Sequence, residues 1–122
     1  MIGINVRNTA NEKFADWIVD GQKTIETRKC HTLKRFVGKR VAIIRTGEGK
    51  AQAIGEVTIA SYAWTDSIEW FHRLIDGHKV GESSKFFIGN KGKYLYFLKD
   101  AVRYDEPKQI YGFGIVSRQV HD

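Results

Sequence analysis

Four apolar positions near the start of the chain recur at helical spacing: Ala10, Phe14, Trp17 and Ile18. Thr9 and Glu12 flank this region in the arrangement of a capping box, in which each side chain satisfies a backbone N–H of the other residue. The pattern predicts a helix over about Ala10–Asp20. Gly21 follows it, and glycine readily adopts the left-handed conformation that ends helices. We therefore expect the chain to reverse at Gly21 and to run extended over Lys23–Arg28.

Much of the remaining chain alternates between apolar and polar positions, which is typical of half-buried strands. Strands are expected at Arg40–Arg45, Gln52–Tyr62, Tyr94–Leu98, Ala101–Tyr104 and Gly112–Val120. Glycines between the first two of these strands indicate a hairpin. A short second helix is expected after the capping box Asp66–Glu69, and Gly77 ends it. Five or six strands with two or three short helices favour an α+β fold in the form of a small mixed β-barrel.

The length of 122 residues fits one compact domain, residues 1–122, with a single core. The apolar runs are far shorter than the roughly 20 residues that a membrane-spanning helix needs, and the N-terminus lacks the pattern of a signal peptide. We therefore expect a cytoplasmic protein with no membrane partner. Cys30 is the single cysteine, and the four histidines do not pair at metal-ligand spacing. These residues predict neither a metal site nor a cofactor.

Positive charge is concentrated in one third of the chain. The formal net charge is +6, and the segment Gln22–Lys50 holds nine basic residues against two acidic ones. A local excess of this kind attracts polyanions, so RNA or single-stranded nucleic acid is the expected class of partner. An acidic protein partner and a merely solubilising surface remain as alternatives. The residues expected to form a nucleic-acid surface are Lys29, Lys34, Arg35, Lys39, Arg40 and Arg45.

The turn after the first predicted helix carries the pattern G-x-K-x-x-E-x-R, formed by Gly21, Lys23, Glu26 and Arg28. In a strand, Glu26 and Arg28 share one face with Thr24, so Lys23 comes beside Glu26 only if it still lies within the turn. A lysine donates hydrogen bonds, and a carboxylate accepts them from a base edge. An arginine binds a carboxylate or a phosphate through two parallel hydrogen bonds. The cluster suits a polar ligand, and Glu26 with Arg28 also fits a structural ion pair.

This pattern, with the helix before it and the strands after it, resembles the signature of ASCH domains, small β-barrel proteins related to the PUA domain. The resemblance extends along nearly the whole chain, because Tyr96–Arg103, Pro107 and Gly112 follow in the order typical of that family. It implies a PUA-like barrel that binds RNA, a nucleotide or a modified nucleoside in a cleft. An aromatic residue at the rim of such a barrel can stack on a base. The expected ligand-binding residues are Gly21, Lys23, Thr24, Glu26, Arg28 and Trp64.

The same resemblance leaves an enzyme as the alternative. Some small ASCH proteins look like amidohydrolases that remove the acetyl group from N-acetylated cytidine, and others are ribonuclease-like. The amidohydrolase pattern has a threonine nucleophile three residues after the motif lysine, where this chain has Glu26. Thr24 or Thr27 replaces that nucleophile only with a different local geometry. If the protein is a hydrolase, Lys23 and Glu26 are the expected catalytic residues, and we otherwise expect binding alone.

Overall fold

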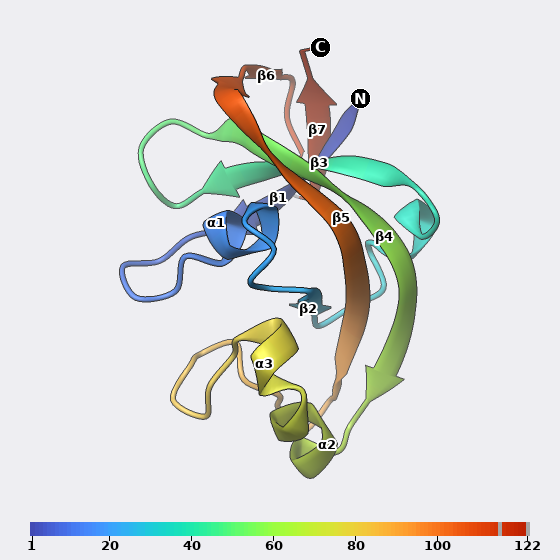
Figure 1. Ribbon diagram of the computed structural model, residues 1–122. Coiled ribbons are helices and arrows are strands. Elements are labelled where there is room, and N and C mark those ends of the chain that lie inside the picture. Colours follow the sequence, from blue (N-terminus) through green and yellow to red (C-terminus); the bar gives the residue numbers. More distant parts are fainter. Residues whose placement is uncertain (115, 122) are drawn as a thin grey trace.

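A long, curved sheet of seven strands forms the frame of the molecule (Figure 1). The computed structural model describes residues 1–114 and 116–121. The strands are β1 (Ile2–Arg7), β2 (Ile25–Arg28), β3 (Arg40–Thr46), β4 (Gln52–Thr65), β5 (Lys93–Lys108), β6 (Ile110–Tyr111) and β7 (Ser117–Val120). They lie in the order β2-β5-β4-β3-β1-β7-β6. Since β1 runs parallel to β3 and the other described pairs are antiparallel, the sheet is mixed and the fold is α+β, as predicted.

Short helices connect the strands: α1 (Phe14–Val19), α2 (Ile68–Arg73), α3 (Ile75–His78) and the 3-10 turn η1 (Lys34–Phe36). The α1 helix packs against β3 and β4 through its apolar face, which buries Phe14 and Ile18. The segment Gly21–Arg28, here called the motif segment, follows α1 and also contacts α3. Thr24 N donates a hydrogen bond to Gly77 O of α3 at 2.9 Å. The motif segment and β2 therefore lie between α1 and α3, as Figure 1 shows.

The sheet curves toward a barrel without closing. Its two longest strands, β4 and β5, pair with register shifts at three places, and such bulges bend and twist a strand pair. Asp100 lies beside one of these irregular stretches with a φ of 55°. The edge strands β2 and β6 are not paired with each other in the described chain. The prediction of a five- or six-stranded barrel is therefore corrected to an open sheet of seven strands with a barrel-like curve.

Several element boundaries differ from the prediction for local reasons. Thr9 Oγ1 accepts a hydrogen bond from Glu12 N at 3.1 Å, so the capping turn forms, but the helix begins only at Phe14. The strands expected at 94–98 and 101–104 are one strand, β5, because the chain around Asp100 forms a bulge instead of a turn. The second helix is interrupted at Leu74, which separates α2 from α3.

Two further differences concern strands at the ends of the chain. The prediction lacks β1, although Ile4 and Val6 alternate with polar residues and are buried. The strand expected over 112–120 is replaced by β6 and β7, and residue 115 lies outside the described residues. Of the described helices, none has the length and apolar character to cross a membrane.

Candidate functional site: a cationic cleft beside β2

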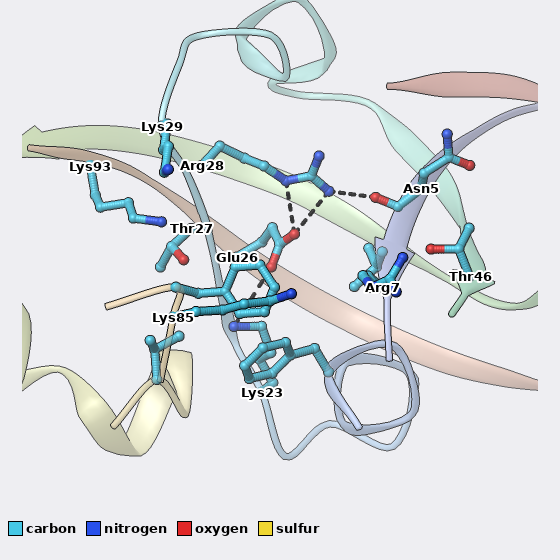
Figure 2. Close-up of a pocket in the computed structure, with 14 residues that line it drawn as sticks. Asn5, Arg7, Lys23, Glu26, Thr27, Arg28, Lys29, Thr46, Lys85 and Lys93 are labelled. Carbon is cyan, nitrogen blue, oxygen red and sulfur yellow. Dashed lines mark hydrogen bonds and ion pairs between the residues drawn. The ribbon is translucent and has the colours of Figure 1, made fainter. Parts of the chain in front are cut away.

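A cleft opens where the edge strand β2 faces β1 across the gap that the sheet leaves unpaired (Figure 2). Its volume is about 450 Å³, which lies within the roughly 300–1,000 Å³ typical of small-molecule sites. The charged side chains that line it are Arg7, Lys23, Glu26, Arg28, Lys29, Lys85 and Lys93. Six of these seven are cationic, so the cleft is strongly positive and its negative charge is confined to Glu26.

The turn before β2 brings Lys23 to Glu26. Gly21 has a φ of 79°, the left-handed conformation expected for it, and Lys23 N donates a hydrogen bond to Trp17 O at 2.9 Å. Lys23 therefore still belongs to the turn, and β2 begins only at Ile25. Lys23 Nζ lies 3.6 Å from Glu26 Oε1. The two side chains meet because a turn, and not a continuous strand, separates them.

Lys23 is almost completely buried, with 1% of its side chain exposed. Its Nζ donates a hydrogen bond to His78 O and lies 4.6 Å from the centre of the Phe14 ring. Burial lowers the pKa of Lys23 to about 8, and the Glu26 carboxylate opposes this fall because it favours the charged amine. Lys23 is thus mainly a cation at neutral pH, and groups of the protein surround its charge.

His78 holds the carbonyl group that accepts from Lys23. Its Nδ1 accepts a hydrogen bond from Val80 N at 2.9 Å, and its Nε2 lies 2.5 Å from Phe71 O. Because Nδ1 is an acceptor, the ring proton is on Nε2 and the imidazole is neutral. Burial lowers the pKa of His78, which favours the same neutral form. This histidine therefore supports the site from behind, a role that nothing in its sequence context indicates.

Arg28 joins β2 to β1 through its side chain. Its Nε donates to Glu26 Oε2 at 2.9 Å, and its Nη2 donates to Asn5 O at 2.6 Å. Figure 2 shows the guanidinium group between these two partners. Glu26, with 8% of its side chain exposed, therefore has a lysine beside one carboxylate oxygen and an arginine on the other. The ion pair thus links β2 to β1, and both of its members line the cleft.

Three residues of the predicted ligand site lie away from the cleft lining. Gly21 shapes the turn, and Thr24 is exposed, with its backbone bonded to α3. Trp64 lies on β4 opposite Tyr94, with 49% of its surface exposed. Lys23, Glu26 and Arg28 are the members that the fold brings together. A role in ligand binding remains a prediction for all six residues.

The predicted nucleic-acid surface is divided among different surroundings. Lys29 lines the cleft, whereas Lys34 and Arg35 border a second hollow beside η1. Lys34 Nζ also lies 5.1 Å from the centre of the Tyr62 ring, so a cation and an exposed aromatic ring meet there. Lys39 is exposed to solvent just after η1. These four residues keep accessible positive charge near the cleft or on the loop that leads from it.

The other two residues of that predicted surface are engaged within the β3–β4 hairpin. Arg40 Nε donates to Glu56 Oε1 at 2.6 Å. Arg45 Nη2 donates to Gln52 Oε1 at 3.3 Å. Because these guanidinium groups already have partners in the protein, they offer less to a phosphate than an uncommitted lysine does.

Sequence reasoning missed the cleft residues that come from segments distant from the motif. Lys85, Phe86 and Lys93 line the cleft, as do Asn5 and Arg7 of β1. Lysines and aromatic residues alternate over 85–94, a mixture that suits nucleic-acid contacts. That signal alone does not say which of these residues reach the cleft. Among residues 1–114 and 116–121, no group of three or more potential metal ligands gathers at one place.

Comparison with solved structures finds the same fold in an ASCH protein from Zymomonas mobilis. A crystal structure of that protein matches with a TM-score of 0.62 and 21% identity, over 88% of this chain and 71% of the other. Two point mutants of it match similarly. One has a TM-score of 0.65 and 22% identity, over 86% of this chain and 72% of the other. The second has a TM-score of 0.63 and 20% identity, over 88% of this chain and 73% of the other. No family model and no curated protein matches the sequence. The predicted resemblance to the ASCH domain is thus confirmed at the level of the fold.

Proposed function

We propose that this ASCH-fold protein binds RNA or a nucleotide, with a base inserted into the cleft between β1 and β2. The observation that carries the proposal is the placement of Glu26, a carboxylate with 8% of its side chain exposed, at the wall of a cavity whose other charged lining residues are all cations. A buried acceptor of this kind recognises donor groups of a ligand, while the cations around it attract the negative charge that a nucleic acid carries.

Glu26 has the hydrogen-bonding capacity for a base edge. A carboxylate offers about four lone-pair sites, and Arg28 Nε and Nη2 lie at Oε2 while Lys23 Nζ lies 3.6 Å from Oε1. The remaining sites suit the amino group of a base such as cytosine, a recognised pairing of carboxylates in nucleic-acid complexes. Lys23 and Arg28 hold the carboxylate in place, so little side-chain entropy is lost on binding.

Aromatic residues give the cleft an apolar wall. Phe86 and Phe14 both line it, with ring centroids 5.8 Å apart in an edge-to-face arrangement. Proteins that bind unpaired bases commonly stack them on such rings, a contact of about 1–3 kcal/mol per base. A cavity of about 450 Å³ admits a single nucleotide unit and excludes a duplex. The proposal therefore concerns single-stranded RNA or a free nucleotide.

A hydrolase is the second candidate, because Thr27 lines the cleft while Thr24 is exposed outside it. The pKa of Lys23, lowered to about 8, would also suit a proton-transferring group. Against this, the Lys23 amino group donates to His78 O and faces Glu26, so it is engaged within the protein. Binding is therefore the function that the geometry supports best.

The test is a titration with the four 5′-mononucleotides and a short single-stranded RNA, using wild type and the Glu26→Gln variant. Glu56→Gln is the matched control, because Glu56 is also held by an arginine, Arg40 at 2.6 Å, but lies outside the cleft. We expect Glu26→Gln to weaken binding at least tenfold, about 1.4 kcal/mol, and Glu56→Gln to leave it unchanged. Equal affinities for the two variants, with intact melting curves, would refute base recognition by Glu26.

The same titration separates cleft binding from surface binding. Replacing Lys34 and Arg35 by glutamine should weaken the single-stranded RNA and flatten its salt dependence, since these exposed cations lie in the second hollow. Affinity for a mononucleotide should not change, because that ligand is too short to reach both places. Loss of mononucleotide binding in this double variant would contradict the assignment of the base to the cleft.

A further inference from the structure

Lys93 is a largely buried lysine with no hydrogen-bond or ion-pair partner among residues 1–114 and 116–121. It is the first residue of β5, is 3% exposed and lines the cleft. Within the described residues, no hydrogen bond or ion pair engages its Nζ. Lys23 is buried to a similar degree, but His78 O, Glu26 and the Phe14 ring surround its Nζ. Since a charge held in the protein is costly unless it is paired, the Nζ of Lys93 is left to interact with whatever enters the cleft, and an anion is the partner that suits it best.

The strand register adds a second cation beside it. β2 pairs antiparallel with β5, and the last pair sets Arg28 opposite Tyr94. β2 ends at Arg28, and Lys29 and Lys93 are the next residues beyond this last pair. They lie close enough that, after burial, the charge of Lys29 contributes most to lowering the pKa of Lys93. Figure 2 shows the amino groups of both lysines on the same side of the cleft, next to Thr27.

A rigid strand end holds Lys93 in this position. Gly92 precedes it with a φ of 81°, and a Cβ atom there would lie 2.7 Å from Thr65 O and 2.6 Å from the Trp64 ring. Only glycine fits so close an approach of two backbones. Lys93 itself pairs with Thr65 at the end of β4. The fold therefore fixes the backbone of Lys93 beside the cleft that its side chain lines.

We propose that Lys93 and Lys29, with the hydroxyl group of Thr27, form a phosphate subsite, so that the cleft selects a nucleotide over the free nucleoside. A phosphate group brings enough negative charge for two ammonium groups and several oxygens that accept their hydrogen bonds. Glu26 repels an anion, so the phosphate lies toward Lys93 while the base lies toward Glu26. The placement of the base rests on the proposed function, whereas the phosphate subsite can be tested without it.

The experiment compares each 5′-mononucleotide with its nucleoside by calorimetric titration of wild type, Lys93→Met and Lys91→Met. Lys91 is the matched control, because it is an exposed lysine two residues away that does not line the cleft. We expect wild type and Lys91→Met to bind the nucleotide at least tenfold more tightly than the nucleoside. Lys93→Met should lose this preference while it keeps its affinity for the nucleoside. A dinucleoside monophosphate, titrated in parallel, distinguishes a phosphate within an RNA strand from the terminal phosphate of a free nucleotide.

A preference for nucleotides that survives in Lys93→Met overturns the subsite. Equal wild-type affinities for nucleotide and nucleoside also overturn it, and they leave the proposed function standing if Glu26→Gln still weakens both ligands. Conversely, Lys93-dependent binding of inorganic phosphate, combined with indifference of all nucleosides to Glu26→Gln, supports the subsite and refutes base recognition.

Inorganic phosphate also provides a test that needs no variant. Titrated into wild type, it should shift the side-chain NMR signals of Lys93 and Lys29 and leave those of Lys91 in place. Uniform small shifts across all lysines, without saturation, would overturn the subsite independently of how any variant folds.

Discussion

Arg28→Met should destabilise the protein far more than a single charge removal usually does. The guanidinium donates to Glu26 Oε2 at 2.9 Å and to Asn5 O at 2.6 Å, and hydrogen bonds to charged groups contribute about 1.5–3 kcal/mol each. Its removal also leaves Glu26, 8% exposed, with Lys23 at 3.6 Å as its remaining cation. Because 20% of the Arg28 side chain is exposed, solvent screens part of this, and we expect a loss of about 2–3 kcal/mol in the free energy of unfolding.

The measurement is urea unfolding followed by tryptophan fluorescence, with Arg73→Met as the control. Arg73 pairs with Glu69 at 2.6 Å, but the two side chains are 72% and 76% exposed, so this removal should cost less than about 0.5 kcal/mol. With m-values of about 1–3 kcal/mol/M for small proteins, the Arg28 variant should unfold at a midpoint about 0.7–3 M lower. Arg28→Lys should recover little of the loss, since one ammonium group does not reproduce the geometry of the guanidinium donors that bind Glu26 and Asn5. If Arg28→Met and Arg73→Met unfold at the same urea concentration, the side-chain link that Arg28 makes between β2 and β1 does not stabilise the protein, and our reasoning is wrong.

Two further predictions concern Lys23. Its pKa is about 8 in the folded protein and near 10.5 when unfolded, so the unfolded state binds more protons between these values and stability should rise with pH across that window. Relative to Lys23→Met, wild type should gain about 2 kcal/mol between pH 8 and pH 10 in urea unfolding, and parallel pH profiles for the two proteins would contradict the burial of the charge. Incubation with N-acetylated cytidine should release little cytidine, because Glu26 stands where the amidohydrolase pattern has its nucleophile. Rapid release that Lys23→Met abolishes, as measured by chromatography, would make the protein an enzyme with Thr27 as the nucleophile to test next.

The local part of the site follows from the sequence. Gly21 predicts a left-handed residue after a helix, and its φ of 79° confirms that turn. Whether Lys23 lies within that turn does not follow from the sequence, and the structure places it there, which brings it to Glu26. Short-range geometry of this kind depends on the conformational preference of glycine, which composition and spacing reveal directly.

The long-range part does not follow, because it depends on strand register. Arg28 reaches Asn5 on β1, a strand missing from the prediction, and nothing near Arg28 in the sequence indicates that partner. Lys93 comes beside Lys29 only through the pairing of β2 with β5. A shift of one residue would send either side chain to the opposite face of the sheet. The bulge near Asp100 likewise joins two predicted strands into one, because β5 pairs with β4 on both sides of it.

The seam between β1 and β2 makes ligand binding and the shape of the sheet thermodynamically reciprocal. Arg28 spans the seam, and one of its two acceptors, Glu26 Oε2, belongs to the proposed recognition group. A ligand that accepts from the Arg28 guanidinium in place of Asn5 O favours the wider seam, and a fluctuation that widens the seam frees the guanidinium on its β1 side, while the bond to Glu26 stays because both residues lie on β2. By thermodynamic linkage, the free energy by which ligand binding favours the wider seam equals the free energy by which the wider seam favours ligand binding. A backbone ladder between these strands would have separated the two events, because its bonds use no atom that a ligand needs.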